Sequence, residues 1–459
     1  MRQDEDLTGR GTCMDETIVA LSTACGLGAV AVVRLSGPDS WAVARGMVAE
    51  RKKFDSLAER GMALFDLVNR DGERIDRALA VKFAGPRSYT GEDIVEFHCH
   101  GGLAVSSAVI DTARRGGARN ATAGEFTRRA FLNGRLDLVQ AEAVDNLIHA
   151  RTEDGRRAAL AGLDSDLGGR VERMRASLLD IRSELEYRID FPDEAGREHS
   201  PERIDIFISK TISSLDSLLA GAERALIVSR GAVTVIAGAP NVGKSSLFNR
   251  LLDEERSIVT GSPGTTRDAV ERETVLDGRL IRLVDTAGLR DGGEEAEKIG
   301  VEYGRKYIAG SDVVVFVHEA GADFARAEKS FLAEHGDKKL VRVLNKIDLQ
   351  PDGASPPDGY LPVSAKTGEG LDRLKQAIAG AVENTGSGPG DSGSMVTSLR
   401  QKKLLEEARE LLEAIETANP PELIAADIGE VCDRLGEITG RIAGEDVLDS
   451  IFSRFCIGK

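Results

Sequence analysis

The feature that most constrains this chain is the loop Gly238-Ala239-Pro240-Asn241-Val242-Gly243-Lys244-Ser245, which directly follows an apolar run over residues 233–237. Two glycines with four residues between them, followed by Lys and Ser, are typical of a phosphate-binding loop between a strand and a helix. Glycines let backbone N–H groups turn towards the phosphates, while Lys244 would neutralise them and Ser245 would offer an oxygen to Mg²⁺. A helix beginning near Ser246 would add the positive end of its dipole.

Three downstream stretches predict that the nucleotide is GTP. Asp285-Thr286-Ala287-Gly288 ends a predicted strand over 280–284; Asp285 can hold Mg²⁺ through water, and the Gly288 N–H can sense the terminal phosphate. Asn345-Lys346-Ile347-Asp348 ends a strand over 340–344. The Asp348 carboxylate accepts hydrogen bonds, which matches two N–H donors on a guanine edge and mismatches adenine. Ser364-Ala365-Lys366 would supply a backbone contact to the base oxygen.

The residues expected to promote hydrolysis differ from those of Ras-type GTPases. Leu289 stands where those proteins carry the Gln that orients the attacking water. Leucine has no polar group, so another group is needed, and the acidic run over 291–297 is the nearest source. Asn241 is open to two interpretations. It can hold a monovalent cation that offsets transition-state charge, or it can be a turn residue.

Composition restricts the class of protein. The chain has 459 residues, with 60 Lys plus Arg against 76 Asp plus Glu and a formal net charge of −16. Any contact with RNA is therefore expected to be a local patch or to come from a partner. The 5 cysteines are widely spaced, which favours reduced thiols. With neither a signal-peptide pattern nor a long apolar run, the sequence predicts a cytoplasmic location and no membrane insertion.

Hydrophobic periodicity predicts an α/β region, a helical region, a second α/β region and further helices, after an extension over residues 1–14. Strands are predicted over 17–21, 29–35, 78–83 and 94–99. Helices are predicted over 39–50, 103–115, 138–151, 160–189, 204–227, 398–417 and 421–440. A Gly/Ser-rich stretch over 384–394 is predicted to be a flexible linker.

This order predicts a GTPase domain inserted into a helical domain. The expected domains are an N-terminal α/β domain over 1–125, a helical domain over 126–228 and 395–459, and the inserted GTPase domain over 229–383. Insertion is economical because the two ends of an α/β unit commonly lie close together. The two junctions, near Ser229 and within the linker, are expected to act as hinges.

Three other positions bear on function. Arg34 interrupts an apolar strand, and a buried guanidinium requires an anionic partner, which is either an internal carboxylate or a ligand. His98-Cys99-His100 is not predicted to bind a metal, because adjacent strand residues face opposite ways. Cys456, three residues from the C-terminus, is either a reactive thiol or a small apolar side chain that packs.

The sequence resembles the MnmE family, also called TrmE, of tRNA-modification GTPases over residues 15–459. The matching stretches are 33–37, 89–93, 100–102, 124–126, 130–143, 191–192, 264–268 and the terminal Cys456-Ile457-Gly458-Lys459. That ending, combined with an inserted GTPase domain, is highly specific to this family. The resemblance implies an N-terminal domain that binds a tetrahydrofolate one-carbon carrier and forms a homodimer, and a helical domain that brings the C-terminal tail to that pocket.

The resemblance also implies a role for particular residues. Formyl- or methylene-tetrahydrofolate would contact Arg34, Glu96, Arg135 (where relatives can have Lys) and Lys459, with Cys456 as a candidate pocket thiol. Mg²⁺ would be held by Ser245 and Thr266, and K⁺ by Asn241, Thr260, Ser262 and Thr265. Glu297 would polarise water, and Lys244 would act on the phosphates. The GTP-binding set comprises Asn241, Val242, Gly243, Lys244, Ser245, Ser246, Thr260, Gly261, Ser262, Pro263, Gly264, Thr265, Thr266, Asp285, Thr286, Ala287, Gly288, Asn345, Lys346, Asp348, Ser364, Ala365 and Lys366.

By the same resemblance, the chain would be a potassium-stimulated GTPase that works in a hetero-oligomer with an FAD-dependent, MnmG-like partner. Together they would place a carboxymethylaminomethyl or aminomethyl group on carbon five of the tRNA wobble uridine. Folate would supply the carbon, FAD would handle electrons, and hydrolysis would open and close the GTPase domains.

Two alternatives are a ribosome-assembly GTPase, which would need a basic RNA-binding appendage, and a regulatory switch without a folate site.

Overall fold

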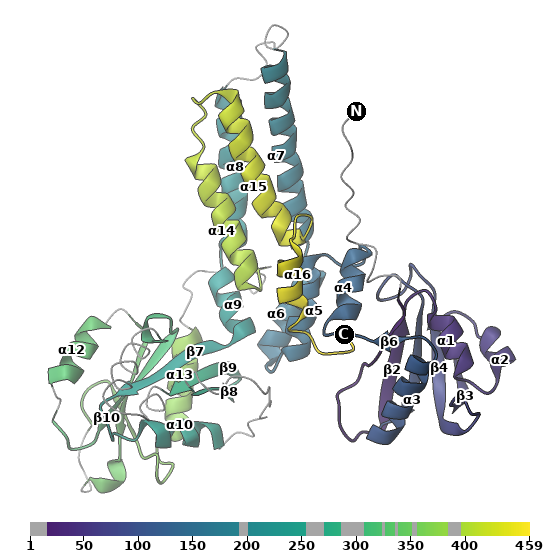
Figure 1. Ribbon diagram of the computed structural model, residues 1–459. Coiled ribbons are helices and arrows are strands. Elements are labelled where there is room, and N and C mark those ends of the chain that lie inside the picture. Colours follow the sequence, from purple (N-terminus) through teal and green to yellow (C-terminus); the bar gives the residue numbers. More distant parts are fainter. Residues whose placement is uncertain are drawn as a thin grey trace, which may run out of the picture. The chain divides into compact units, whose positions relative to one another are not determined.

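The computed structural model describes residues 16–191, 201–253, 270–285, 307–323, 326–335, 338–350, 356–383 and 396–459 (Figure 1). The chain forms two compact units. The first unit comprises Met1–Asp145, Gly168–Leu179 and Cys432–Lys459, and the second comprises Asn146–Leu167 and Asp180–Val431. The predicted extension over 1–14 and linker over 384–394 lie outside the described residues. Among the described helices, none combines the length and apolar character needed to cross a bilayer.

A six-stranded sheet of order β3-β4-β5-β2-β1-β6 forms the centre of the first unit. Its strands are β1 (Ile18–Leu21), β2 (Val30–Ser36), β3 (Met62–Val68), β4 (Arg74–Phe83), β5 (Ile94–His100) and β6 (Arg119–Asn120). All neighbours pair antiparallel except β1 and β6. The register places Arg34 of β2 between Ala20 of β1 and Glu96 of β5.

The two faces of this sheet have different chemistry, because side chains alternate along each strand. Val33, Phe65 and Phe97 are fully buried on one face. They pack in a core with α1 (Ser40–Gly46), α2 (Arg51–Asp55) and α3 (Leu103–Arg115). Cys99 lies on this face at 2% exposure, whereas the side chains of its neighbours His98 and His100 are 27% and 73% exposed. The predicted opposite orientation of Cys99 and its two neighbours is confirmed.

The first unit also contains helices from both ends of the chain. They include α4 (Glu125–Leu132), most of α5 (Leu138–His149) and α16 (Glu445–Phe452). Phe131, Leu138, Leu448, Phe452 and Phe455 form an apolar cluster that joins these three helices and the residues after α16. The C-terminal residues thus lie in the same compact unit as the N-terminal sheet.

The second unit contains a doubly wound sheet of order β12-β11-β10-β7-β9-β8. Its strands are β7 (Ala232–Gly238), β8 (Val270–Leu276), β9 (Arg279–Asp285), β10 (Val313–Glu319), β11 (Leu340–Asn345) and β12 (Tyr360–Val363). All pair parallel except β8 with β9. The helices around it are α10 (Lys244–Asp253), α12 (Arg326–Glu334), α13 (Leu371–Glu383) and the short η3 (Ile347–Leu349). The central strands β7 and β10 are mostly apolar, as expected when helices cover both faces.

The helical region comprises α6 (Glu153–Asp164), α7 (Leu167–Asp190), α8 (Pro201–Leu219), α9 (Ala222–Arg230), α14 (Leu399–Ala414) and α15 (Pro421–Thr439). Helix α14 follows the inserted sheet in sequence yet is linked to α8, which precedes it, by an ion pair between Arg409 and Asp216 at 2.6 Å. Mixed α/β and helical architecture was predicted, and the structure confirms it. The predicted domain boundaries at 125, 228 and 383 remain predictions.

The structure corrects several predicted elements. The helix predicted over 160–189 is two helices, because Ser165 is extended after α6. The helix predicted over 204–227 is also two, because Gly221 adopts a left-handed φ of 77° before α9. The helix predicted over 39–50 ends at Gly46, and Val48 bridges to Leu67 instead. Neither β3 nor α16 was predicted. In β3, exposed Met62 and Leu64 alternate with buried Phe65 and Leu67, which obscures the apolar–polar period.

Candidate functional site

The predicted phosphate loop joins β7 to α10, and its backbone conformation requires glycine at two positions. Gly238 has φ 147° and Gly243 has φ 94°. A Cβ at Gly238 would lie 2.2 Å from the Val317 carbonyl oxygen, and one at Gly243 would lie 2.4 Å from Asn345 Nδ2. Asn241 has φ 63°, a left-handed conformation that Asn adopts more readily than most residues. This conformation agrees with a turn role for Asn241 and leaves its cation role a prediction.

Lys244 is the buried charged residue of this loop. Its side chain is 5% exposed, and Nζ donates a hydrogen bond to the Ala239 carbonyl at 2.7 Å. The ammonium group therefore folds back over the loop whose backbone would face phosphates. Ser245 and Ser246 follow it as exposed residues in the first turn of α10.

Asn345 links the phosphate loop to the loops predicted to read the base. Its side chain is 1% exposed; Nδ2 donates to the Val242 carbonyl at 2.8 Å, and Oδ1 accepts from the Ala365 N–H at 3.0 Å. The Asp348 carboxylate accepts a hydrogen bond from Ser364 Oγ at 2.6 Å, so the 345–348 loop is bonded to the 364–366 loop. Of the remaining residues of these loops, Lys346 pairs with Glu319 at 2.9 Å and Lys366 is exposed.

These loops lie at one edge of the sheet. They follow the carboxyl ends of β7, β11 and β12, where α/β sheets commonly bind ligands. Asp285 ends β9 opposite Ile236 of β7 and is 5% exposed. Its carboxylate and the Ser245 hydroxyl are oxygen donors of the kind Mg²⁺ prefers. The predicted site residues Thr260, Gly261, Ser262, Pro263, Gly264, Thr265, Thr266, Thr286, Ala287, Gly288 and Glu297 lie outside the described residues.

A second candidate site lies on the first-unit sheet around Arg34. Arg34 Nε donates to Glu96 Oε1 at 2.8 Å, and the two side chains are 17% and 16% exposed. The guanidinium carbon lies 5.5 Å from the ring centre of Tyr89 and 5.6 Å from that of Phe126. Of the two partners predicted for Arg34, an internal carboxylate or a ligand, the structure shows the internal carboxylate. Arg34 also lies against two aromatic rings.

The two rings come from different segments that are hydrogen-bonded to each other. Phe126 belongs to α4 and is fully buried. Tyr89 belongs to the turn between β4 and β5, and its hydroxyl lies 2.9 Å from Thr127 Oγ1 of α4. Burial raises the pKa of Tyr89, which keeps its hydroxyl protonated at neutral pH.

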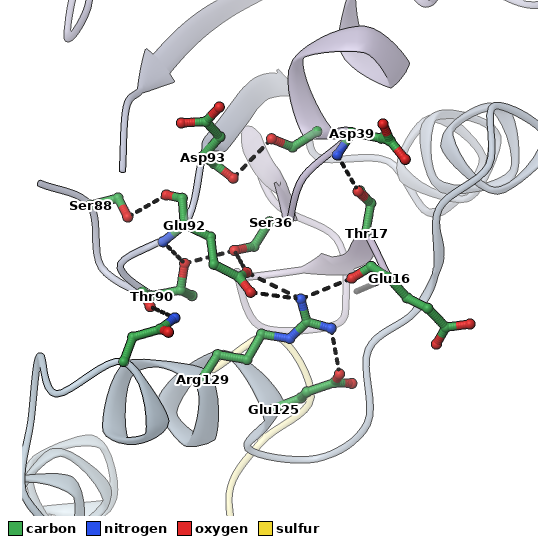
Figure 2. A network of polar contacts seen from close by, with 12 residues as sticks. Glu16, Thr17, Ser36, Asp39, Ser88, Thr90, Glu92, Asp93, Glu125 and Arg129 are labelled. Atoms are coloured by element: carbon green, nitrogen blue, oxygen red, sulfur yellow. Dashed lines mark hydrogen bonds and ion pairs between the residues drawn. The ribbon is translucent and has the colours of Figure 1, made fainter. Parts of the chain in front are cut away.

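A buried ionic network lies beside these rings, and Figure 2 shows Arg129 at its centre. Arg129 Nη1 lies 3.1 Å from both carboxylate oxygens of Glu92 and 2.9 Å from the Glu16 carbonyl, and Nη2 lies 3.0 Å from Glu125 Oε1. Burial tends to raise the pKa of Glu125, but hydrogen bonds from Arg119 and the Thr122 N–H, with nearby positive charge, lower it to about 2. Glu125 is therefore ionised beside Arg129 at neutral pH.

The C-terminal tail reaches the strand next to Arg34. Ile457 bridges to Ala123 in an antiparallel manner. Gly458 has φ 99°, and a Cβ there would lie 2.1 Å from the carbonyl oxygen of Leu21. Leu21 follows Ala20, the residue paired with Arg34, so the partly buried Lys459 is brought to this part of the sheet. The side chain of Cys456 is exposed, contrary to a packing role.

Arg135 lies near the turn that carries Tyr89. A Cβ at Gly91 of that turn would lie 3.3 Å from Arg135 Cγ, and Asn133 Nδ2 donates to the Thr90 carbonyl at 2.7 Å. Of the four predicted folate contacts, Arg34 and Glu96 touch each other directly, whereas Arg135 is exposed beside the turn and Lys459 ends the tail.

Tyr89, Glu92, Phe126 and Arg129 were not among the site residues predicted from the sequence. The first three lie in stretches matching the family, 89–93 and 124–126, which was the available signal. Their roles depend on the contacts between a turn and a helix that are distant in sequence.

Gly458→Ala is expected to release the tail, because its φ and the contact with Leu21 both exclude a side chain. Carboxypeptidase should then remove Lys459 about tenfold faster, as expected for a strained left-handed residue costing roughly 1–2 kcal/mol. Gly444→Ala is the matched control, because nothing lies within 4 Å of a Cβ there. Equal rates of release from Gly458→Ala and the unmodified chain would contradict the docking of the tail.

Two family models match this chain over adjacent ranges. A model described as the GTP-binding protein TrmE N-terminus matches residues 17–135, and one described as the MnmE helical domain matches 138–456. The chain is 37% identical over 457 residues to the tRNA modification GTPase MnmE of Thermotoga sp. strain RQ2, covering 97% of this chain and 100% of that one. It is 40% identical over 463 residues to the protein of the same name from Moorella thermoacetica, covering 97% and 100%. The G domain of the T. maritima FeoB iron transporter is 27% identical, covers 33% of this chain and 98% of its own, and has a TM-score of 0.23.

Proposed function

The chain belongs to the MnmE family of tRNA modification GTPases, and from this premise we propose that it modifies carbon five of the tRNA wobble uridine. GTP hydrolysis and a part in tRNA modification follow from the family. The finer proposal is that a carboxymethylaminomethyl or aminomethyl group is installed there. The observation that carries it is the Arg34–Glu96 ion pair, whose guanidinium lies against two aromatic rings, in the unit that matches the TrmE N-terminus.

A reduced folate is the proposed ligand of this second site, with Arg34, Glu96, Arg135 and Lys459 as contacts. Its anionic glutamate tail suits a guanidinium or ammonium group, and its pterin N–H donors suit a carboxylate. Tyr89 and Phe126 supply aromatic surface next to these charges. When bound, formyl- or methylene-tetrahydrofolate would supply the one-carbon unit. Cys456 is exposed at the tail and remains a candidate pocket thiol.

The proposed nucleotide chemistry uses the phosphate loop and residues that follow it. Lys244 and the loop N–H groups would hold the phosphates, and Ser245 with Thr266 would hold Mg²⁺. Asn241, Thr260, Ser262 and Thr265 would hold K⁺, and Glu297 would polarise the attacking water. Asn345, Asp348 and the 364–366 loop would bind the guanine.

We further propose that the chain forms a homodimer and works with an FAD-dependent, MnmG-like protein. Support for self-association comes from the sheet face opposite the first-unit core. Met62, Leu64 and Leu79 are 54%, 40% and 36% exposed there, and Leu64 pairs opposite Leu79. Contiguous exposed apolar side chains commonly mark a protein interface.

Reconstitution tests the proposed function. The purified chain, the flavin partner, GTP, potassium, unmodified tRNA and an amine donor, glycine or ammonium, would be incubated with a reduced folate that carries a ¹³C label on its one-carbon unit. Mass spectrometry of the digested tRNA should find the label at carbon five of the wobble uridine. A modified uridine without label would remove folate from the proposal, and no modification of that base would remove the reaction itself.

Asn241→Ala is expected to abolish the difference between GTP hydrolysis rates in potassium and in sodium. The unmodified chain should hydrolyse GTP at least about tenfold faster in potassium, because a cation against the phosphates stabilises transition-state charge. Asn249→Ala, on an exposed position of α10, is the matched control and should keep the difference. If the potassium advantage survives in Asn241→Ala, that residue acts only in the turn.

A further inference from the structure

We propose that Arg129 and Glu92 are positioning residues for the folate site: their buried ion pair holds the 89–93 turn against α4. The pair thereby sets the position of the Arg34 slot, by which we mean the Tyr89 and Phe126 rings and the Arg34 side chain that lies against them. This inference rests on the proposed folate function and adds two residues to it. Neither is expected to touch the folate. They act on the walls of the site rather than on the ligand.

The slot depends on a contact between separate segments. Tyr89 comes from the turn after β4, Phe126 comes from α4, and the Arg34 guanidinium of β2 lies against both rings. A shift of the turn relative to α4 would change the separation of the two rings. The direction of the Arg34 guanidinium would change with it, because the rings and Glu96 are the groups that the structure places around it.

Arg129 supplies the charged connection between these segments. Its side chain is 2% exposed, and it contacts Glu92 of the turn, Glu125 of its own helix and the carbonyl of Glu16 before β1. Figure 2 shows the guanidinium pointing from the helix towards Glu92 and Glu16. A planar guanidinium can serve several acceptors at once in fixed directions, which a lysine ammonium on a flexible chain does less well.

Glu92 carries the connection back to the strand of Arg34. Its Oε2 accepts a hydrogen bond from Ser36 Oγ at 2.7 Å, and Ser36 Oγ lies 2.7 Å from Thr90 Oγ1. Ser36 is two residues after Arg34 in β2 and therefore on the same face of the sheet. The ion pair is thus connected to all three parts of the slot: the turn, the helix and the strand.

Two conservative variants test the proposal in the full chain. Arg129→Lys keeps the charge and loses the planar fork, while Glu92→Gln keeps the shape and leaves Arg129 paired with Glu125. Each is expected to weaken binding of 5-formyltetrahydrofolate about tenfold by calorimetry, roughly the loss of one charge-assisted hydrogen bond. Arg128→Lys is the matched control, because Arg128 is on the same helix but pairs with Glu445 and Asp449 of α16. Wild-type affinity in Glu92→Gln would overturn the proposal even if Arg129→Lys failed to fold.

A double-mutant cycle separates positioning from general stabilisation. If Glu92 acts through the slot, Glu92→Gln should cost little further affinity in a Tyr89→Leu background, because the wall that it positions is already lost. If it only stabilises the fold, the two losses should add, and that result would overturn the inference alone. If the unmodified chain binds no 5-formyltetrahydrofolate, the proposed folate site fails and this inference fails with it.

Discussion

Asn345→Ala is expected to weaken GTP binding about 100-fold. The buried side chain makes one hydrogen bond to the phosphate loop at Val242 and one to the base loop at Ala365. Alanine would leave the Val242 carbonyl and the Ala365 N–H without these partners, at a cost of roughly 1–3 kcal/mol for each group. Loss of both connections lets the loops separate, so the affinity for the whole nucleotide falls. Titration with a fluorescent GTP analogue measures the effect.

Asn345→Asp gives a graded control for this prediction. The aspartate keeps an oxygen for the Ala365 N–H and loses the donor to the Val242 carbonyl, so its affinity should lie between those of the alanine variant and the unmodified chain. Thermal unfolding of each variant without nucleotide shows whether the fold is retained. Unchanged affinity in Asn345→Ala would mean that the two loops are held together by other contacts.

Arg34→Ala is expected to reduce binding of 5-formyltetrahydrofolate by at least about 100-fold, because it removes a guanidinium proposed to contact the folate. It also leaves a partly buried carboxylate without its partner, which costs several kcal/mol. The variant removes the Arg34 ion pair from Glu96 and the side chain that lies against Tyr89 and Phe126. Isothermal titration calorimetry of the full chain measures the loss.

Arg45→Ala is the control for the Arg34 prediction. Arg45 also forms an ion pair in the first unit, with Asp55 at 2.7 Å, but both side chains are 47% exposed. Exposed pairs contribute little, so folate binding should remain as in the unmodified chain. Should Arg34→Ala bind folate normally, Arg34 would be a structural partner of Glu96 and the ligand would have to be held elsewhere.

Local sequence patterns predicted the helices and strands that depend only on neighbouring residues in the chain. The helix over 103–115 and the strands at 94–99 and 29–35 were found within one residue at each end, because each is an unbroken stretch with clear boundaries. Patterns failed where a single residue changes the backbone, as at Ser165 and Gly221. They also failed at β3, whose two faces are both largely apolar.

The two candidate sites differ in how far they could be read from sequence. The phosphate loop is contiguous, and the glycines that its motif requires are those at which the structure leaves no room for a side chain. The site around Arg34 draws on β2, β5, a turn, α4 and the C-terminal tail. For Arg34, sequence predicted an anionic partner without identifying it, and the structure shows that Glu96 fills this role.

The sequence by itself determined the guanine-nucleotide motifs, the α/β and helical character of the segments and the family, because these depend on residue type and short spacing along one chain. Only the tertiary structure decided that Asn345 joins two nucleotide loops, that Arg129 joins α4 to the 89–93 turn, and that the tail docks beside Leu21. These contacts join residues far apart in sequence, and their energies depend on burial and direction, which exist only once the chain has folded.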